Sequence, residues 1–390
     1  MPPNYYVIGL NSGTSFDGID VALVKFKTGS LIPKFIDGIL CEYPKVVKDK
    51  VGNLIIETCH GMSQRGVSLR EISQLNFLLG ELFADAALQI IKKNKLKSKD
   101  ILLIASHGQT VFHHPQIEEI GKYKVRSTLQ IGESSIIAQK TGITTVSNFR
   151  EADIAAGGQG APLVPYLDWV IFNKSKNIKA VLNIGGISNV TIVGKNIIPI
   201  AFDIGPGNAL IDLLAKSYKK DFDQDGKLAL RGNVYFSCVE KALKDPYFNK
   251  KPPKSTGKEY FNLAFIKKYF SKIKKKEDKI ATITYFTART IQYSFQKFVF
   301  PQYKVDELVI SGGGIKNKTL MKYLKKLITV EAYSHMPLLT ISNKYGLPSK
   351  YKEAILFALL GYTCHLGKTN NIPSCTGAKK KVILGKITEV

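Results

Sequence analysis

Four glycine-containing turns, each directly after a run of strand-forming residues, place the strongest constraint on the fold of this chain. They are Gly13-Thr14-Ser15, Gly185-Gly186, Gly205-Pro206-Gly207 and Gly312-Gly313-Gly314. Glycine lets backbone N–H groups approach an anion without a Cβ in the way, and neighbouring hydroxyls add donors. One such turn is typical of ordinary strand ends. Four of them, in two similar halves, predict a nucleotide bound in a cleft between two domains.

The two halves of the chain repeat one plan of strand, glycine-containing hairpin turn, strand, strand and helix. In the first half the strands are predicted at residues 5–10, 19–26 and 34–42, and the helix at 69–93. In the second half the strands are predicted at 180–184, 190–193 and 199–202, and the helix at 209–218. The repetition predicts an α/β protein with two domains, which we place at residues 1–146 plus 365–390 and at 147–364.

The remaining elements are shorter or less regular. Strands are predicted at residues 101–106, 143–147, 307–311 and 382–387, and helices at 318–327 and 351–366. Residues 233–279 are predicted to be helical and rich in lysine, and residues 148–165 to form a loop near the domain boundary. The strand at 101–106 is expected to end before the polar segment His107-Gly108-Gln109-Thr110.

The charge of the chain suggests an anionic partner but not a specific one. Fifty-six basic residues against 31 acidic ones give a net charge of +25. Only six of the basic residues are arginine, the residue that favours bidentate recognition of phosphates and bases. We therefore expect a compositional excess of lysine and no specific nucleic-acid partner. A nucleic-acid-binding basic protein stays as a distant alternative.

Cysteine usage and hydropathy point to the reducing interior of a cell. The five cysteines are scattered and form no C-x-x-C pair, which favours buried thiols over disulfides or zinc. The start of the sequence is typical of a strand entering a loop, so we expect no signal peptide, and no apolar run reaches the about 18 residues of a membrane span. We expect a soluble, cytoplasmic protein without a membrane partner.

Carboxylates beside the turns are the candidates for catalysis. Asp203 stands at a predicted strand end, immediately before Gly205-Pro206-Gly207. Phosphoryl transfer needs a carboxylate-held divalent cation and a base for the nucleophile, and Asp203 is placed for one of those tasks. Asp17, Asp20 and Asp153 are further candidates, although a single Asp in such a position is more often a turn or cap residue.

Other motifs narrow the chemistry further. His107 is expected to hydrogen-bond a substrate with Gln109, whereas His113 and His114 lack the further ligands of a zinc site. Neither the P-loop pattern nor the G-x-G-x-x-G dinucleotide pattern occurs in the sequence.

Several long sequence blocks together resemble the anhydro-N-acetylmuramic acid kinase family. They run in order from about residue 7 to 387 and read GLNSGTSFDGIDVAL, SHGQTVFHHP, LQIGESSIIAQKTGI, DIAAGGQGAPLVP, LNIGGISNVT, FDIGPGNALID, PPKSTGKEYFN, SGGGIKN and NIPSCTGA…VILGKI. Levoglucosan kinase, a close relative, shares many of them. The resemblance implies the fold of the actin and hexokinase superfamily, with two ribonuclease-H-like domains closing on ATP and a sugar. It also implies a homodimer.

The resemblance implies an unusual reaction. Such kinases open the 1,6-anhydro bridge of a sugar with water while they phosphorylate O6, and they release the sugar 6-phosphate and ADP. In this sequence Asp203 matches the catalytic base that activates the water. Asp203 and Glu353 match the carboxylates near the Mg²⁺ ion.

The resemblance also implies two sets of binding residues. For ATP they are Gly13, Thr14, Ser15, Phe16, Asp17, Gly18, Ile19, Asp20, Gly185, Gly186, Gly205, Gly207, Gly312 and Gly313. For the sugar they are His107, Gly108, Gln109, Arg150 and Asp153.

One departure from the family pattern bears on the substrate. Muramic-sugar kinases often read D-F-R-R-R-D where this chain has residues 148–153, so that Glu151 and Ala152 replace two arginines. If these arginines attract the lactyl carboxylate of the muramic sugar, their loss favours levoglucosan as the substrate. The Leu-Asn of GLNSGTS also favours levoglucosan. The GGQG segment and the NIPSCTGA tail look like the muramic branch. We favour anhydro-N-acetylmuramic acid, with levoglucosan as the alternative and a nucleotide-binding relative without catalysis as a third possibility.

Overall fold

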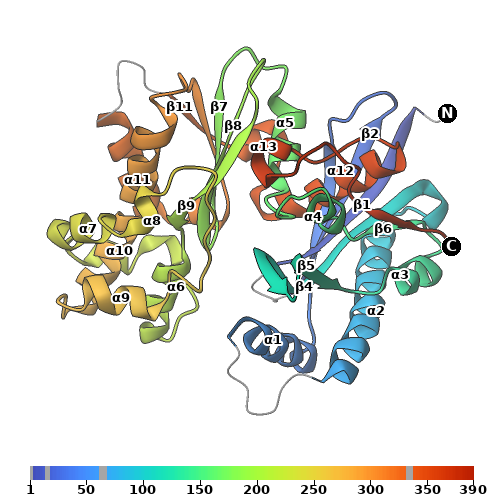
Figure 1. Ribbon diagram of the computed structural model, residues 1–390, viewed down its shortest axis with the longest axis horizontal. Coiled ribbons are helices and arrows are strands. Elements are labelled where there is room, and N and C mark those ends of the chain that lie inside the picture. Colours follow the sequence, from blue (N-terminus) through green and yellow to red (C-terminus); the bar gives the residue numbers. More distant parts are fainter. Residues whose placement is uncertain (1–2, 14–17, 61–67, 331–336) are drawn as a thin grey trace. The chain divides into compact units, whose positions relative to one another are not determined.

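The computed structural model describes residues 3–13, 18–60, 68–330 and 337–390 (Figure 1). The chain divides into two compact units. The first comprises Met1–Val170 and Gly346–Val390, and the second Ile171–Tyr345. Four residues that the sequence predicts to bind ATP, Thr14, Ser15, Phe16 and Asp17, lie outside the described part of the chain.

The first unit is built on a sheet whose strand order is β3-β2-β1-β4-β6-β12, with β5 paired to β4. The strands are β1 (Asn4–Ser12), β2 (Gly18–Lys27), β3 (Lys34–Glu42), β4 (Ile101–Ile120), β5 (Tyr123–Ile131), β6 (Thr145–Ser147) and β12 (Lys386–Thr388). The first three strands are antiparallel, whereas β4 runs parallel to β1 and β6 runs parallel to β4. The predicted hairpin between the first two strands is confirmed.

Helices cover both faces of this sheet. The helices of the unit are α1 (Lys45–His60), α2 (Leu69–Lys93), α3 (Ser134–Thr141), α4 (Glu151–Ala155), α5 (Val164–Phe172), α12 (Lys352–His365) and α13 (Pro373–Thr376), with short 3-10 turns η1 (Ser98–Asp100) and η8 (Ser349–Tyr351). Alternate residues of a strand face opposite sides. Ile8 and Leu10 of β1 accordingly pack in one core with α2. Gly9 faces α12, where a Cβ would lie 1.8 Å from the Ala354 carbonyl oxygen.

The sheet of the second unit repeats the arrangement that β3, β2, β1, β4 and β6 have in the first. Its order is β9-β8-β7-β10-β11, formed by β7 (Lys179–Ile184), β8 (Ile187–Val193), β9 (Ile200–Pro206), β10 (Glu307–Ser311) and β11 (Leu338–Ile341). Here too three antiparallel strands are followed by two parallel ones. The predicted duplication of a ribonuclease-H-like α/β plan is therefore confirmed in the topology of the two sheets.

The helices of the second unit form a second, aromatic core beside the sheet. They are α6 (Ala209–Ala215), α7 (Phe236–Leu243), α8 (Pro246–Asn249), α9 (Leu263–Phe270), α10 (Lys276–Ser294) and α11 (Lys318–Val330), with a π turn η5 (Phe295–Val299) and the 3-10 turns η2 (Lys216–Tyr218), η3 (Gln224–Gly226), η4 (Ala229–Arg231), η6 (Gly313–Lys316) and η7 (Ser342–Tyr345). Phe248, Phe261 and Phe286 are fully buried in this core. The lysine-rich residues 233–279 therefore form helices whose apolar faces pack into this core.

Several predicted segments have other lengths or structures than expected. The strand expected at residues 101–106 continues to Ile120, because β5 supplies hydrogen-bond partners along the polar segment. The strand expected at 199–202 continues to Pro206 beside β8. The tail expected as a strand at 382–387 pairs only over Lys386–Thr388. The loop expected at 148–165 contains α4 and the start of α5.

The two units also divide the chain differently from the predicted domains. Residues 147–170 and 346–364 group with the first unit, whereas the sequence suggested the second domain for them. The close approach of α12 to β1 gives the physical reason, since this helix covers the sheet of the first unit. No helix in the described part of the chain is long and apolar enough to span a membrane. Cys41, Cys238, Cys364 and Cys375 are free thiols.

Candidate active site

Asp203 of β9 is held by backbone groups of the second unit. Its own N–H donates to the Lys254 carbonyl oxygen (2.9 Å), and the Thr256 N–H donates to Asp203 Oδ2 (3.0 Å). The Tyr247 hydroxyl donates to the Asp203 carbonyl oxygen (2.7 Å). The carboxylate therefore sits at a fixed place on a strand, with one oxygen bonded to a backbone donor.

The electrostatic surroundings of Asp203 suit a base. Burial raises its pKa to about 6, while the Thr256 hydrogen bond and the charge of Lys254 act to lower it, and Glu259 acts to raise it. Lys254 is itself buried between the rings of Tyr247 and Phe298, with its Nζ 4.7 and 4.9 Å from their centres. Burial lowers the pKa of Lys254 to about 8. A carboxyl group with a pKa near 6 is mostly ionised at neutral pH and can still take up a proton.

Three of the predicted glycine turns come together at one end of the second sheet. Backbone N–H groups of Gly207 and Asn208 donate to the carbonyl oxygens of Gly186 and Gly185 (2.9 and 2.8 Å). A Cβ on Gly207 would lie 2.2 Å from the Gly185 carbonyl oxygen, so only glycine permits this approach. Gly312 joins them, since a Cβ there would lie 2.4 Å from the carbonyl oxygen of Ile184.

Two other predicted glycines of this unit lie close by. Gly205 belongs to β9 two residues after Asp203, and a Cβ there would lie 2.9 Å from the Phe248 ring. Gly313 begins the turn η6, where a Cβ would lie 3.7 Å from Asn208 Nδ2. The glycines of the three turns and Asp203 thus lie in the same part of the second unit.

The segment between Lys254 and Glu259 adds groups that the sequence interpretation did not assign. Besides Lys254 and the Thr256 N–H, it brings Lys258 over the first turn, with Cε 3.1 Å and Nζ 3.9 Å from where a Cβ of Gly186 would lie. The signal was present, because the segment belongs to the block PPKSTGKEYFN. No local pattern indicated that this block would lie against β9 and the β7–β8 turn.

In the first unit, the end of β1 connects two predicted site residues. Asn11 Nδ2 donates to Glu353 Oε2 at the start of α12 (2.7 Å). The neighbouring Ser12 hydroxyl donates to Gln109 Oε1 on β4 (2.6 Å) and lies 3.1 Å from the Gly18 carbonyl oxygen. Gly13 follows directly on Ser12. Polar groups of β1, β2, β4 and α12 therefore meet at the end of this strand.

The other residues of the predicted ATP loop continue into β2. Gly18 starts the strand and packs against the β3 backbone, where a Cβ would lie 2.3 Å from the Cys41 carbonyl oxygen. The Ile19 side chain is buried in the core of the unit. Asp20 is partly exposed and pairs with Asn11 in the β1–β2 register.

The buried His107 pairs with the half-buried Arg150. Arg150 Nε donates to His107 Nε2 (3.1 Å), and its Nη1 donates to the Gly160 carbonyl oxygen (2.7 Å). The His107 proton is therefore on Nδ1, which lies 3.1 Å from the Gly108 carbonyl oxygen. Burial and the Arg150 charge hold the pKa of His107 well below its ordinary value, so the ring is neutral. The ring also stacks on Phe357 of α12 at 4.4 Å.

Asp153 holds a backbone loop in place. Its carboxylate accepts hydrogen bonds from the Gly160 N–H (2.9 Å), Asn371 Nδ2 (2.8 Å) and the Thr376 hydroxyl (2.7 Å), and its side chain is fully buried. These bonds join the GGQG segment to the NIPSCTGA tail. Asp153 is thus placed to position the loop that Arg150 also contacts.

The carboxylates of the described residues form no ready-made metal site. No group of three or more His, Cys, Asp or Glu side chains converges among them. Asp203 belongs to the second unit and Glu353 to the first, and each presents carboxylate oxygens of the kind that Mg²⁺ prefers. Either carboxylate could therefore contribute a ligand to a bound Mg²⁺ ion.

Comparison with known proteins agrees with the motifs over the whole chain. Residues 5–390 match the family described as "Anhydro-N-acetylmuramic acid kinase". The anhydro-N-acetylmuramic acid kinase of Caldanaerobacter subterraneus subsp. tengcongensis is 46% identical over 98% of this chain and 96% of its own. Those of Francisella tularensis subsp. novicida and Bacillus cereus (strain G9842) are 41% and 40% identical, over 98% of this chain and 98% and 99% of theirs.

Proposed function

This chain belongs to the anhydro-N-acetylmuramic acid kinase family, and we propose that it converts 1,6-anhydro-N-acetylmuramic acid, water and ATP into N-acetylmuramic acid 6-phosphate and ADP. It is a kinase, a phosphotransferase with an alcohol group as acceptor. The single observation that carries this conclusion is the match to curated relatives at up to 46% identity over 98% of the chain.

Asp203 is proposed as the general base of the reaction. The water oxygen attacks C1 of the sugar, its proton passes to the Asp203 carboxylate, and the bond between C1 and O6 breaks. O6 then takes the γ-phosphoryl group from ATP, and ADP leaves. The fixed backbone contacts of Asp203 and its pKa of about 6 support this role, because the carboxylate is both positioned and ionised at neutral pH.

The glycine turns of the second unit are proposed to bind the ATP phosphates. Gly186 and Gly207 lie beside each other there, and the Lys258 side chain covers Gly186. An ammonium group beside a turn that lacks side chains suits a phosphate, because the phosphate can approach the backbone closely. Gly13, Gly18 and the rest of the predicted loop of the first unit are proposed to contact the nucleotide as well.

The polar groups of the first unit are proposed to bind the sugar and the metal. His107, Gln109 and the half-buried Arg150 are proposed to line the sugar site, where bonds to His107 and to the Gly160 carbonyl oxygen hold the Arg150 guanidinium in place. Glu353 and Asp203 are each proposed as a ligand of Mg²⁺, and the exposed Glu353 carboxylate, oriented by Asn11, fits such a role. When bound, Mg²⁺ would neutralise phosphate charge during the transfer.

The structure accounts for the acid that replaces a family arginine. The Glu151 carboxylate accepts hydrogen bonds from Asn148 Nδ2 (2.5 Å) and the Arg150 N–H (3.1 Å). These bonds stabilise the turn formed by residues 148–151. Arg150 keeps its place beside His107. This supports the muramic sugar over levoglucosan, because a cationic side chain remains for the lactyl carboxylate. A homodimer in the cytoplasm stays a prediction.

A comparison of the two sugars tests the proposed function. Purified protein with ATP and Mg²⁺ is supplied with anhydro-N-acetylmuramic acid or levoglucosan, and formation of each 6-phosphate gives kcat/KM. We expect a clear preference for the muramic sugar. A preference for levoglucosan would show that levoglucosan, and not the muramic sugar, is the substrate. No turnover of either sugar by folded protein would refute the proposed function.

A further inference from the structure

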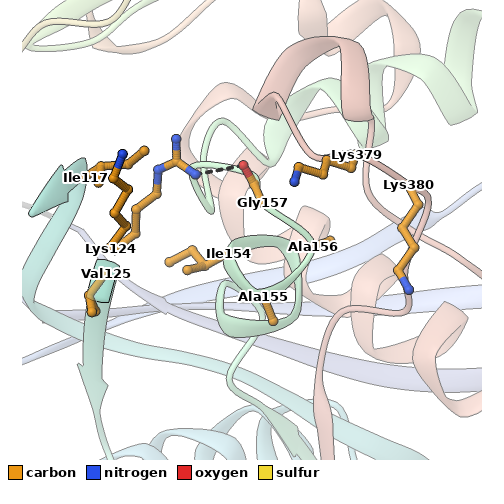
Figure 2. A pocket seen from close by; sticks show the side chains of 10 residues that line it. Ile117, Lys124, Val125, Ile154, Ala155, Ala156, Gly157, Lys379 and Lys380 are labelled. Carbon is orange, nitrogen blue, oxygen red and sulfur yellow. Dashed lines mark hydrogen bonds between the residues drawn. The ribbon is translucent and has the colours of Figure 1, made fainter. Parts of the chain in front are cut away.

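A basic pocket of the first unit is not used by any step proposed above. Its volume is about 510 Å³, and ten residues line it (Figure 2). They are Ile117, Lys124, Val125, Arg126, Ile154, Ala155, Ala156, Gly157, Lys379 and Lys380. A volume of this size falls in the range of about 300–1,000 Å³ that small-molecule sites occupy.

The lining residues carry four positive charges and no negative one. Lys124 and Arg126 come from β5, whereas Lys379 and Lys380 come from the C-terminal tail. Two acids lie on the neighbouring strand: the Glu119 carboxylate is 3.8 Å from Lys124 Nζ in a pair that is mostly exposed, and Glu118 stands opposite Val125 in the β4–β5 register. Such an exposed pair contributes little, so the pocket stays strongly attractive to an anion.

The framework of the pocket is fixed by hydrogen bonds. Arg126 Nε donates to the Pro115 carbonyl oxygen (2.8 Å), and its Nη1 donates to the Gly157 carbonyl oxygen (2.8 Å), the bond drawn in Figure 2. Nη2 of Arg126 has no protein partner among the described residues. The Lys379 N–H donates to the Ala156 carbonyl oxygen (2.8 Å), which ties the tail to the same segment. The guanidinium is thus oriented before any ligand binds.

The lysines of the C-terminal tail and the apolar residues of α4 occupy different parts of the pocket. In Figure 2 the Lys379 side chain points towards Gly157, whereas Lys380 lies farther along the pocket and Ile154 and Ala155 lie below. A ligand that matches this surface has a compact anionic group and an organic body that covers the apolar side chains. Several cations without a lining acid favour a phosphate ester, which carries about −1.5 to −2 charges at pH 7, over a single carboxylate.

We propose that this pocket is a second binding site, distinct from the residues proposed for catalysis, and that it takes the phosphate monoester of a sugar. The phosphate binds between Arg126 and Lys379, and the sugar lies over Ile154 and Ala156. The choice of a sugar phosphate rests on the proposed function, whose product belongs to this class. The site would let the enzyme sense its product.

Calorimetric titration with defined phosphates tests the site. The probes are N-acetylmuramic acid 6-phosphate, glucose 6-phosphate, inorganic phosphate and unphosphorylated N-acetylmuramic acid. The test protein is the double variant Lys379→Gln/Lys380→Gln. The control is Lys122→Gln/Lys381→Gln, which removes two charges from neighbouring positions that do not line the pocket. Lysine variants are preferred to Arg126 variants because Arg126 also holds the hairpin.

We expect the wild-type chain to bind a sugar phosphate at one site that the test variant loses, with affinity at least tenfold weaker and the control within twofold. Binding of the product at the catalytic residues would occur equally in the wild type, the test variant and the control variant, so it does not affect the comparison. Equal binding by test and control variants, or no saturable binding by the wild type, would overturn the proposal. Inorganic phosphate binding as tightly as the sugar phosphates would overturn its sugar part.

Turnover separates this proposal from the proposed function. Initial rates without added product are expected to be unchanged in Lys379→Gln/Lys380→Gln. If the wild-type chain phosphorylates neither anhydrosugar and the test variant still loses phosphate binding, the proposed function fails and the pocket stands. If turnover occurs and the variants bind alike, the function stands and the pocket fails.

Discussion

The Tyr247 hydroxyl donates a hydrogen bond of 2.7 Å to the main-chain carbonyl oxygen of Asp203. Tyr247 belongs to the aromatic core beside the second sheet, where burial is the main cause that raises the pKa of its hydroxyl. The proton of this bond therefore stays on the tyrosine at neutral pH. The bond ties the backbone of Asp203, the proposed base, to the aromatic core. The direction of the Asp203 side chain is therefore set by the strand β9.

Replacing Asp203 by Asn is expected to reduce kcat by about 10²- to 10⁴-fold, because the amide cannot take the proton of water. Asp212→Asn is the matched control, since burial also raises the pKa of Asp212 to about 6 although no catalytic role is proposed for it. Its kcat should stay near that of the wild type. Formation of the sugar 6-phosphate measures both, and a large residual rate in Asp203→Asn would reject Asp203 as the base.

Stability gives an independent readout of the same variant. The pKa of Asp203 in the folded chain, about 6, lies above its ordinary value of 3.8. Protonation therefore stabilises the fold, and this contribution is lost as the pH rises through 6. Asp203→Asn should consequently unfold at a higher temperature than the wild type at pH 8, with a smaller difference at pH 5. A lower unfolding temperature at pH 8 would contradict the burial of a charged carboxylate.

The pH profile of the reaction should follow Asp203. Because the base must be ionised, kcat/KM is expected to fall tenfold per pH unit below about pH 6. The charge of Lys254 lowers the pKa of Asp203, so Lys254→Met should move this limb upward by about one unit. Lys251→Met, at an exposed position nearby, should leave it in place. An acid limb that does not move in Lys254→Met would show that the lysine does not act on the base.

Removing the carboxylate of Glu353 tests the proposed metal ligand. Glu353→Gln is expected to raise the Mg²⁺ concentration for half-maximal rate by about tenfold or more. Asn11→Ala should have a smaller effect in the same direction, because Asn11 only orients Glu353 through its 2.7 Å bond. Glu151→Gln serves as the control, since that carboxylate is bonded within its own turn. An unchanged Mg²⁺ titration in Glu353→Gln would exclude the role.

The ion pair of Lys179 and Glu307 is expected to matter for the stability of the second unit. The two side chains are 7% and 6% exposed, and the Tyr345 and Thr340 hydroxyls also donate to Glu307 (2.6 Å each). Glu307→Gln leaves a buried ammonium uncompensated, at a cost of about 3–5 kcal/mol in the free energy of unfolding.

Urea unfolding followed by circular dichroism measures that cost. Lys179→Met/Glu307→Leu removes both charges and should recover most of the loss. Glu81→Gln breaks the exposed pair with Lys140 and should cost about 1 kcal/mol or less. If Glu307→Gln costs no more than Glu81→Gln, the buried pair is not a stabilising element.

The sequence predicted the elements that local patterns specify. The helix expected at 69–93 has those bounds in the structure, where Ser68 and Glu71 form a capping box. The strands at 34–42 and 307–311 also agree. Strand lengths that depend on a partner could not be predicted, because the polar residues after Ser106 become a strand only through pairing with β5.

The sequence motifs identified candidate site residues, but they did not predict which residues those would contact. A motif indicated Asp203, but its contacts with Tyr247, Lys254 and Thr256 join segments separated by more than 40 residues. Such contacts leave no periodic trace in one sequence. Asp153 shows the converse, since the motif indicated a sugar contact and the structure reveals bonds to the tail, about 220 residues away.

The packing of Gly9 against Ala354 has a consequence for how the protein is made. The first strand to leave the ribosome lacks one of its two covering layers until α12, near the other end of the chain, has been synthesised. The second unit lies between them in the sequence and can complete its own sheet first. The nascent first strand thus keeps one uncovered face until most of the chain has been translated.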